Sequence, residues 1–216
     1  MRTIFEAELT QLGEDLVAMS RLVEAAMADA GTALLTGDVA LAERVIAADR
    51  AVDALERELD ERCVALLAQQ QPVATDLRTV VTALRMSASL ERMGDLARHV
   101  ATVARLRYPT PATPRPLGET FASMHDAANR VARRTTLMLS THDLDVAEQL
   151  ERDDDLLDGL LEEVFATVLA PTWAGSAYET VDATLLARYF ERFGDHGVSI
   201  ARRMVYLVTG EPPVPA

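Results

Sequence analysis

Apolar residues recur along most of the chain at alternating intervals of three and four residues. The first apolar stripe consists of Leu9, Leu12, Leu16, Met19, Val23 and Ala26. Comparable stripes run through residues 41–66 and 186–207. This spacing places apolar side chains on one face of an α-helix and is typical of helices that pack at shallow angles in bundles. Because no convincing run alternates apolar and polar residues with a period of two, we predict an all-α protein.

Glycine and proline divide this pattern into six long helical stretches. Gly37 is typical of the end of one helix, and Asp38 is typical of the N-cap of the next. Pro72 separates another pair of helical stretches. Residues 108–116 hold four of the nine prolines, so we predict a non-helical linker at residues 109–116. Shorter breaks are expected at residues 141–143 and 171–176.

Three helical stretches precede the linker and three follow it. We therefore expect two tandem three-helix bundles, the first over residues 1–108 and the second over residues 117–216. The second bundle is expected to end in a frayed tail that begins at Pro212. A chain of 216 residues is long enough for two small domains.

A short motif is repeated in the last helix of each predicted bundle. Residues 90–95 (LERMGD) recur 100 residues later as residues 190–195 (FERFGD), with four of six positions identical and the other two apolar. The preceding helix of each half also carries a matched pair of acidic residues. The two halves are therefore interpreted as copies of one unit.

Acidic residues spaced four apart lie on one face of a helix, where like charges repel by roughly a few tenths of a kcal/mol per pair. This chain has four such pairs in matched places: Asp49/Asp53, Glu91/Asp95, Asp154/Asp158 and Glu191/Asp195. If the two helices of each half pack together, four carboxylates converge. An all-oxygen site suits magnesium, calcium or manganese and can also hold iron or zinc, so we predict a metal site in each half.

Two glycines support this interpretation. Glycine inside a helix costs about 1 kcal/mol relative to alanine, yet Gly94 and Gly194 occupy the same place in both motifs. We expect a neighbouring backbone or a ligand to approach closely there. The alternative is that the acidic residues form ordinary solvated faces. Possible partners for such faces are Arg50, Arg92, Arg188 and Arg192.

Charge and cysteine content exclude several other classes. All 21 basic residues are arginine, against 34 acidic residues, so the formal net charge is −13. This acidity argues against nucleic-acid binding and against attachment to an anionic membrane. The single cysteine, Cys63, excludes an internal disulfide and lies on an apolar stripe as a small core residue. With no signal-peptide pattern and no stretch of about 20 apolar residues, we expect a cytoplasmic protein without membrane insertion.

The sequence resembles the PhoU family of cytoplasmic regulators of phosphate uptake and phosphate signalling. The resemblance rests on residues 91–95 (ERMGD), 191–196 (ERFGDH) and 76–78 (DLR), together with the six-helix, two-half layout. It implies two similar three-helix bundles and, as in some members, multinuclear metal clusters on the repeated motifs. The ligand candidates carried over by position are Asp49, Asp53, Glu91, Asp95, Asp154, Asp158, Glu191 and Asp195.

The sequence departs from the family pattern in two places. The DLR tripeptide has no counterpart at residues 176–178 (SAY), so the two halves are expected to differ in affinity or occupancy. Ser199 stands before Ile200 and Ala201 where the family usually has asparagine. His99 and His196 adjoin the motifs but are not assigned as ligands.

The resemblance also implies a function. It indicates a negative regulator rather than an enzyme, one that links the ATPase of the phosphate ABC transporter to a membrane sensor histidine kinase. One alternative is a metal-free helical adaptor. Another is a carboxylate-bridged metal oxidase, which normally needs Glu-x-x-His pairs. No histidine of the chain has glutamate three residues before it, which disfavours the oxidase. A homodimer stays open, as does the identity of the metal.

Overall fold

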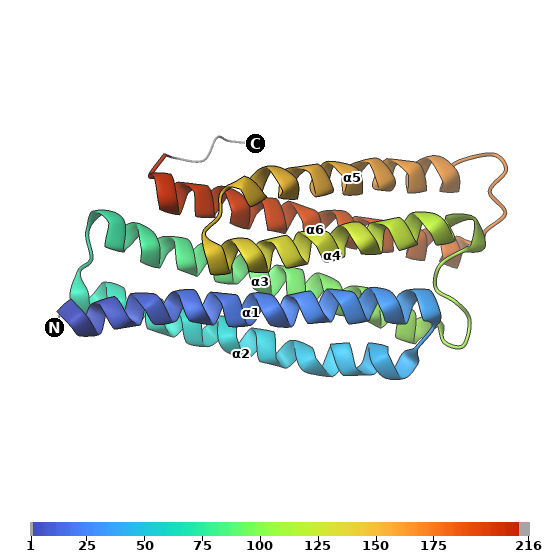
Figure 1. The fold of residues 1–216 in the computed structure, drawn as a ribbon. Coiled ribbons are helices and arrows are strands. Elements are labelled where there is room, and N and C mark those ends of the chain that lie inside the picture. Colours follow the sequence, from blue (N-terminus) through green and yellow to red (C-terminus); the bar gives the residue numbers. More distant parts are fainter. Residues whose placement is uncertain (1, 212–216) are drawn as a thin grey trace.

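The computed structural model describes residues 2–211, with side chains from Phe5 onward. Its six α-helices are α1 (Arg2–Thr36), α2 (Val39–Gln70), α3 (Ala74–Arg107), α4 (Gly118–Thr141), α5 (Asp145–Val168) and α6 (Ala177–Thr209). They run along one common axis and alternate in direction (Figure 1). The described residues contain no β-strand, which confirms the all-α prediction. Among them, no helix combines the length and apolar character needed to cross a bilayer.

The helices begin and end where the local chemistry predicts. Gly37 has a φ of 69°, and the Asp38 carboxylate accepts a hydrogen bond of 2.9 Å from the backbone N–H of Leu41. His142 closes α4 in the left-handed conformation with a φ of 56°. Ser176 and Glu179 form a reciprocal capping box at the start of α6. These caps satisfy backbone groups that the helix itself leaves unpaired.

The linker is less irregular than predicted. Arg115–Leu117 form a short 3₁₀ helix, η1, so the non-helical assignment for residues 109–116 is wrong at its last two positions. Proline lacks only a backbone N–H that the first turn of a helix does not use, and Pro116 occupies such a position. The frayed tail expected from Pro212 lies outside the described residues.

Helices α1–α3 form one three-helix bundle and α4–α6 form the other, as predicted. The bundles pack against each other through two antiparallel contacts, α1 with α4 and α3 with α6. Arg107 near the end of α3 pairs with Asp182 near the start of α6, which fixes the direction of the α3–α6 pair. Helices α1, α3, α4 and α6 therefore form the centre of the molecule, with α2 and α5 on the outside (Figure 1). The bounds 1–108 and 117–216 as separate domains stay predictions.

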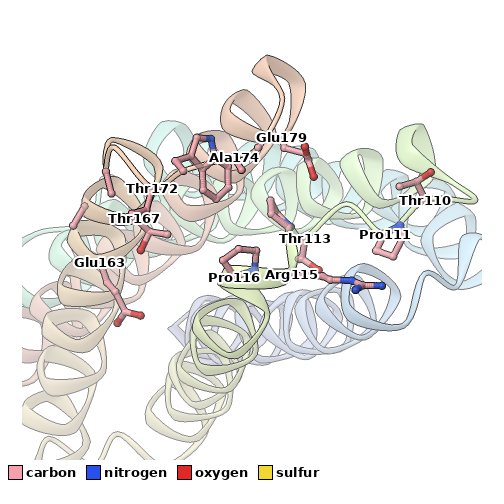
Figure 2. A pocket seen from close by; sticks show the side chains of 15 residues that line it. Thr110, Pro111, Thr113, Arg115, Pro116, Glu163, Thr167, Thr172, Ala174 and Glu179 are labelled. Atoms are coloured by element: carbon pink, nitrogen blue, oxygen red, sulfur yellow. The ribbon is translucent and has the colours of Figure 1, made fainter.

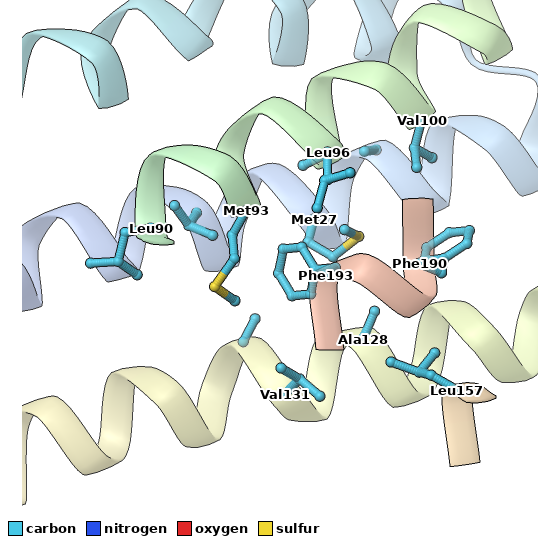
Figure 3. Close-up of a cluster of buried hydrophobic side chains, with 14 of the residues drawn as sticks. Met27, Leu90, Met93, Leu96, Val100, Ala128, Val131, Leu157, Phe190 and Phe193 are labelled. Atoms are coloured by element: carbon cyan, nitrogen blue, oxygen red, sulfur yellow. The ribbon is translucent and has the colours of Figure 1, made fainter. Parts of the chain in front are cut away.

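The hydrophobic core runs through both bundles without interruption. Phe193 of α6 is fully buried, and Met27, Met93 and Val131 from α1, α3 and α4 surround it (Figure 3). Burying one such side chain stabilises a fold by about 1.5–3 kcal/mol. The predicted apolar stripes are largely buried, although Ala48 faces solvent. This core fixes the rotation of α3 and α6, and therefore fixes where their acidic residues lie.

Candidate functional site

The predicted acidic residues of the first half come together in a groove between α2 and α3. We call it the first acidic groove, and its volume is about 600 Å³. Its lining includes all four predicted residues and one further acid from α2: Asp49, Asp53, Glu56, Glu91 and Asp95. Glu56 was not among the candidates, although it lies three residues after Asp53 and so on the same helical face. Burial and neighbouring acidic charges raise the pKa of Asp49, Glu56 and Glu91.

A guanidinium group bridges the two helices of this groove. Arg98 Nε donates to Asp49 Oδ2 and Arg98 Nη2 donates to Asp95 Oδ1, each at 2.6 Å. Arg92 lies 3.5 Å from both Glu91 and Asp95. The sequence interpretation missed Arg98, and its position three residues after Asp95 was the available signal. Because Arg98 neutralises two facing carboxylates, the first groove already contains an internal cation.

The equivalent residues of the second half lie on α5 and α6. We call Asp154, Asp158, Glu191 and Asp195 the second acidic site. Burial raises the pKa of Asp154 to about 7, and the charges of Asp195, Asp158 and Glu191 reinforce that effect. Burial and Asp195 also raise the pKa of Asp158 and of Glu191. The four carboxylates of this half therefore act on one another electrostatically, as the matched spacing predicted.

The second acidic site is less well neutralised than the first. The position 100 residues after Arg98 is occupied by Val198, which cannot bridge carboxylates. Arg188 pairs with Glu191, but Asp154 Oδ1 and Glu191 Oε2 are buried without any hydrogen-bond partner. An unpaired buried carboxylate oxygen is costly. The two halves therefore differ in how their carboxylates are paired, through Arg98 and Val198, while the expected difference in affinity or occupancy stays a prediction.

The two repeated glycines allow the carboxylates to approach. A β-carbon on Gly94 would lie 3.1 Å from Val52 Cγ1 and 3.6 Å from Asp49 Oδ1. A β-carbon on Gly194 would lie 2.4 Å from Asp154 Oδ1 and 2.9 Å from Leu157 Cδ1. The close approach expected at these glycines is present, and it comes from side chains of the neighbouring helix rather than from its backbone.

The alternative that the acidic residues form ordinary solvated faces explains only some of their contacts. Arg92 and Arg188 pair with predicted acidic residues, as that alternative requires. Arg50 and Arg192 form no ion pair with any described residue. Asp154 has no arginine partner among the side chains that the structure describes, which a solvated ion-paired face does not explain.

The carboxylate oxygens of the two clusters are the kind of ligand that a hard cation prefers, but their positions do not form a metal site. Hard cations are bound by oxygen ligands at about 2.0–2.6 Å. Across residues 5–211, no three acidic, histidine or cysteine side chains stand close enough together to hold a metal ion. The two unpartnered oxygens at Asp154 and Glu191 are the ones that a cation would satisfy. The metal assignment of the eight residues stays a prediction.

A larger cavity lies away from both acidic clusters. It has a volume of about 820 Å³ and is enclosed by the linker, the end of α5 and the loop before α6 (Figure 2). Its walls include Pro111, Pro114, Pro116 and Trp173, with Thr180 accepting a hydrogen bond from the Trp173 indole. None of the predicted metal ligands lines this cavity, so its size does not identify it as the site of the repeated motif.

Comparison with known proteins decides the family. The family description "PhoU domain" matches residues 16–104 and 121–204, which together include both acidic clusters. The chain belongs to the PhoU family. It is 39% identical over 213 residues to phosphate-specific transport system accessory protein PhoU homolog 2 of Mycobacterium tuberculosis, a match that covers 99% of this chain and 100% of the relative.

Solved PhoU structures share the whole arrangement. The crystal structure of PhoU from Pseudomonas aeruginosa matches with a TM-score of 0.87 at 30% identity, covering 96% of this chain and 100% of that one. The structure from Streptococcus pneumoniae, described as a phosphate transport system regulatory protein PhoU, matches with a TM-score of 0.82 at 25% identity and covers 98% and 100%. The resemblance seen in the motifs is therefore confirmed, together with the duplicated PhoU fold.

Arg78 of the DLR tripeptide and His99, both noted in the sequence, lie on the side of α3 that faces the second half. Asp76 stands exposed in the first turn of α3, and the Arg78 guanidinium lies 5.7 Å from the centre of the Tyr206 ring. His99 packs its ring against Tyr189 of the other half, with centroids 5.1 Å apart. Arg78 and His99 therefore contribute contacts between the two PhoU halves, and His99 also lies 3.4 Å from Arg98 of the first acidic groove.

Proposed function

We propose that this chain is a negative regulator of phosphate uptake and phosphate-starvation signalling. The observation that carries the proposal is the full-length match, at 39% identity, to a relative named as an accessory protein of the phosphate-specific transport system. In this proposal the chain acts in the cytoplasm as an adaptor between the ATPase of the phosphate ABC transporter and a sensor histidine kinase. It works by binding and not by catalysis.

The shape and charge of the molecule support an adaptor. Six long helices packed on one continuous core give a rigid body with several extended faces. Acidic clusters on both halves and a net charge of −13 suit partners with basic surfaces. Such complementarity mainly increases the association rate and orients the partners.

We also propose that a divalent or trivalent metal ion, such as iron, zinc, magnesium or manganese, binds at the acidic clusters. Asp154, Asp158, Glu191 and Asp195 would hold it in the second half. The equivalent set in the first half would bind more weakly, since Arg98 already pairs with Asp49 and Asp95. A bound cation would remove the carboxylate repulsion and tie α5 to α6.

The regulatory proposal is tested by charge reversal in cells that lack the native copy. The double variant Asp95→Lys/Asp195→Lys is expected to lose co-purification with the transporter ATPase and the kinase, and to relieve repression when phosphate is plentiful. Asp29→Lys/Asp126→Lys, which reverses one exposed acid in each half outside the clusters, is the matched control. Normal repression in the first double variant would contradict a role for the clusters.

The metal proposal has its own test. Protein purified without chelators is analysed for metal content and melted before and after treatment with EDTA. We expect chelation to lower the melting temperature of the wild type and to have little effect on Asp154→Asn/Glu191→Gln. Metal-free protein whose melting temperature does not respond to added manganese or magnesium would favour the metal-free adaptor.

A further inference from the structure

The contact between α3 and α6 has two ends that are related by the internal duplication but differ in chemistry. At one end the ring of His99 packs against Tyr189. The positions 100 residues away from these two are Ser199 and Ser89, which lie together at the other end. Two small hydroxyl side chains thus replace two rings. The space beside them is occupied by Arg203 of α6.

Arg203 is held in place by neutral groups only. Its Nη1 donates to the Ser199 carbonyl oxygen at 3.0 Å and to the Ser199 hydroxyl, and lies 3.5 Å from Ser89 Oγ. The side chain is half-buried. Several other arginines that bridge helices pair with a carboxylate, as Arg98 does with Asp49 and Arg107 does with Asp182. Arg203 forms no ion pair with any described residue.

A second arginine, Arg85, lies on α3 one helical turn before Ser89, which Arg203 contacts. Burial lowers the pKa of Arg203, and the positive charge of Arg85 on α3 lowers it further, with no carboxylate acting in the opposite direction. Arg85 is exposed and makes no hydrogen bond or ion pair within the part of the chain that the structure describes. Arg203 of α6 lies against Ser89 of α3, and Arg85 stands four residues before Ser89 on the same face of α3. Two arginines from different halves therefore border this contact, in a chain whose net charge is −13.

The hydrogen-bond donors that remain unused around Arg203 indicate what kind of ligand would fit there. Ser89 donates its hydroxyl hydrogen to the Arg85 carbonyl oxygen at 3.2 Å. The Ser199 hydroxyl accepts from Arg203 and donates to no described residue. The open donors are thus the Arg85 guanidinium, the remaining N–H groups of Arg203 and the Ser199 hydroxyl. Guanidinium forks match the oxygen spacing of phosphate, and a dianion balances two positive charges where a single carboxylate would not.

We propose that Arg85, Arg203 and Ser199 bind a small phosphate-type oxyanion at the contact between α3 and α6. Each half supplies one arginine, so the bound anion connects the two bundles. The same chemistry serves free inorganic phosphate and the phosphoryl group of a larger ligand. This inference is independent of the regulatory function and of the metal proposal, because binding is measured on the isolated chain.

The test is calorimetric titration of the full chain with inorganic phosphate at constant ionic strength maintained with chloride. We expect saturable binding with one site per chain. Arg85→Gln, at an exposed position, is expected to raise Kd at least about tenfold, which corresponds to about 1.4 kcal/mol. Arg203→Gln is expected to do the same. A parallel titration with glycerol 2-phosphate distinguishes a site for the free ion from a site that also accepts a phosphoryl group.

The matched control is Arg133→Gln, which removes an exposed arginine on α4 that forms no ion pair with a described residue. It should leave Kd unchanged. Circular dichroism of each variant verifies that it is folded. Absence of saturable phosphate binding to the wild type would overturn the proposal, as would an Arg85→Gln variant that is folded and binds phosphate as the wild type does.

Discussion

A β-carbon on Gly194 would lie 2.4 Å from Oδ1 of Asp154. No carbon and oxygen can pack that closely, so the carboxylate of α5 occupies space that only glycine leaves on α6. In the first half the equivalent distance, from Gly94 to Asp49 Oδ1, is 3.6 Å. The second acidic site therefore depends more strongly on its glycine than the first groove does.

Gly194→Ala is expected to lower the free energy of unfolding by about 1–3 kcal/mol, the usual cost of overpacking a buried contact. The added methyl group must displace Asp154 and also Leu157, which is fully buried. Gly94→Ala should cost less, because Val52 lies 3.1 Å away and alanine favours the helix. Urea denaturation at 25 °C measures both variants.

Gly159→Ala is the control for this series. It lies exposed on α5 with no atom within 4 Å of the added methyl group, so it should gain about 0.5–1 kcal/mol from helix propensity. If Gly194→Ala proved as stable as Gly159→Ala, the tight contact with Asp154 would be wrong.

Asp154 is expected to make the stability of the metal-free protein depend on pH in an unusual direction. Its pKa is about 7 in the folded chain against 3.8 for the free group, so the folded state binds the proton more tightly than the unfolded state. The contribution to stability is complete below pH 3.8 and is lost as the pH rises towards 7. Asp154→Asn should therefore become more stable relative to the wild type by roughly 1 kcal/mol or more between pH 5 and 8.

This prediction is measured as the difference in unfolding free energy between Asp154→Asn and the wild type at several pH values in EDTA. The exposed Asp29→Asn on α1 serves as the control. A difference for Asp154→Asn that does not change with pH would contradict the raised pKa.

Arg98 is expected to stabilise the metal-free first half. Arg98→Gln leaves Asp49 and Asp95 facing each other and should cost about 1–2 kcal/mol, since hydrogen bonds to charged groups contribute about that much. If the groove also binds metal, added manganese should raise the melting temperature of Arg98→Gln more than that of the wild type. Arg57→Gln is the control, because Arg57 lines the same groove but bonds only the Asp53 carbonyl.

Cys63 should be chemically inert in the folded chain. It is fully buried, its Sγ lies 3.7 Å from the Val80 carbonyl oxygen, and burial raises its thiol pKa to about 11. Thiolate is the reactive form, so a disulfide reagent such as DTNB should react only after unfolding. Val64→Cys places a thiol at the exposed neighbouring position and should react at once in the native protein. Rapid reaction of native Cys63 would contradict its burial.

The regular part of the fold could be read from local sequence. Helix caps such as Asp38 depend on residues within one turn, and the stripes from Leu12 to Val23 identify the buried face without knowledge of its partner. Ala48 shows the limit of this reasoning. Ala48 lies three residues after Val45 and so fits the apolar stripe of residues 41–66, yet it faces solvent. The width of a buried helix face depends on the helices that surround it.

The duplication and the four acidic pairs were determined by the sequence alone, since the first follows from a repeated motif and the second from spacing along one helix. The tertiary structure decided which charges meet. Only the packing of α2 on α3 brings Arg98 between Asp49 and Asp95, and only the antiparallel contact of α3 with α6 brings Arg203 against Ser89, one turn from Arg85. Electrostatic energies depend on distances between helices, and those distances are set by how the apolar faces interlock rather than by any local pattern.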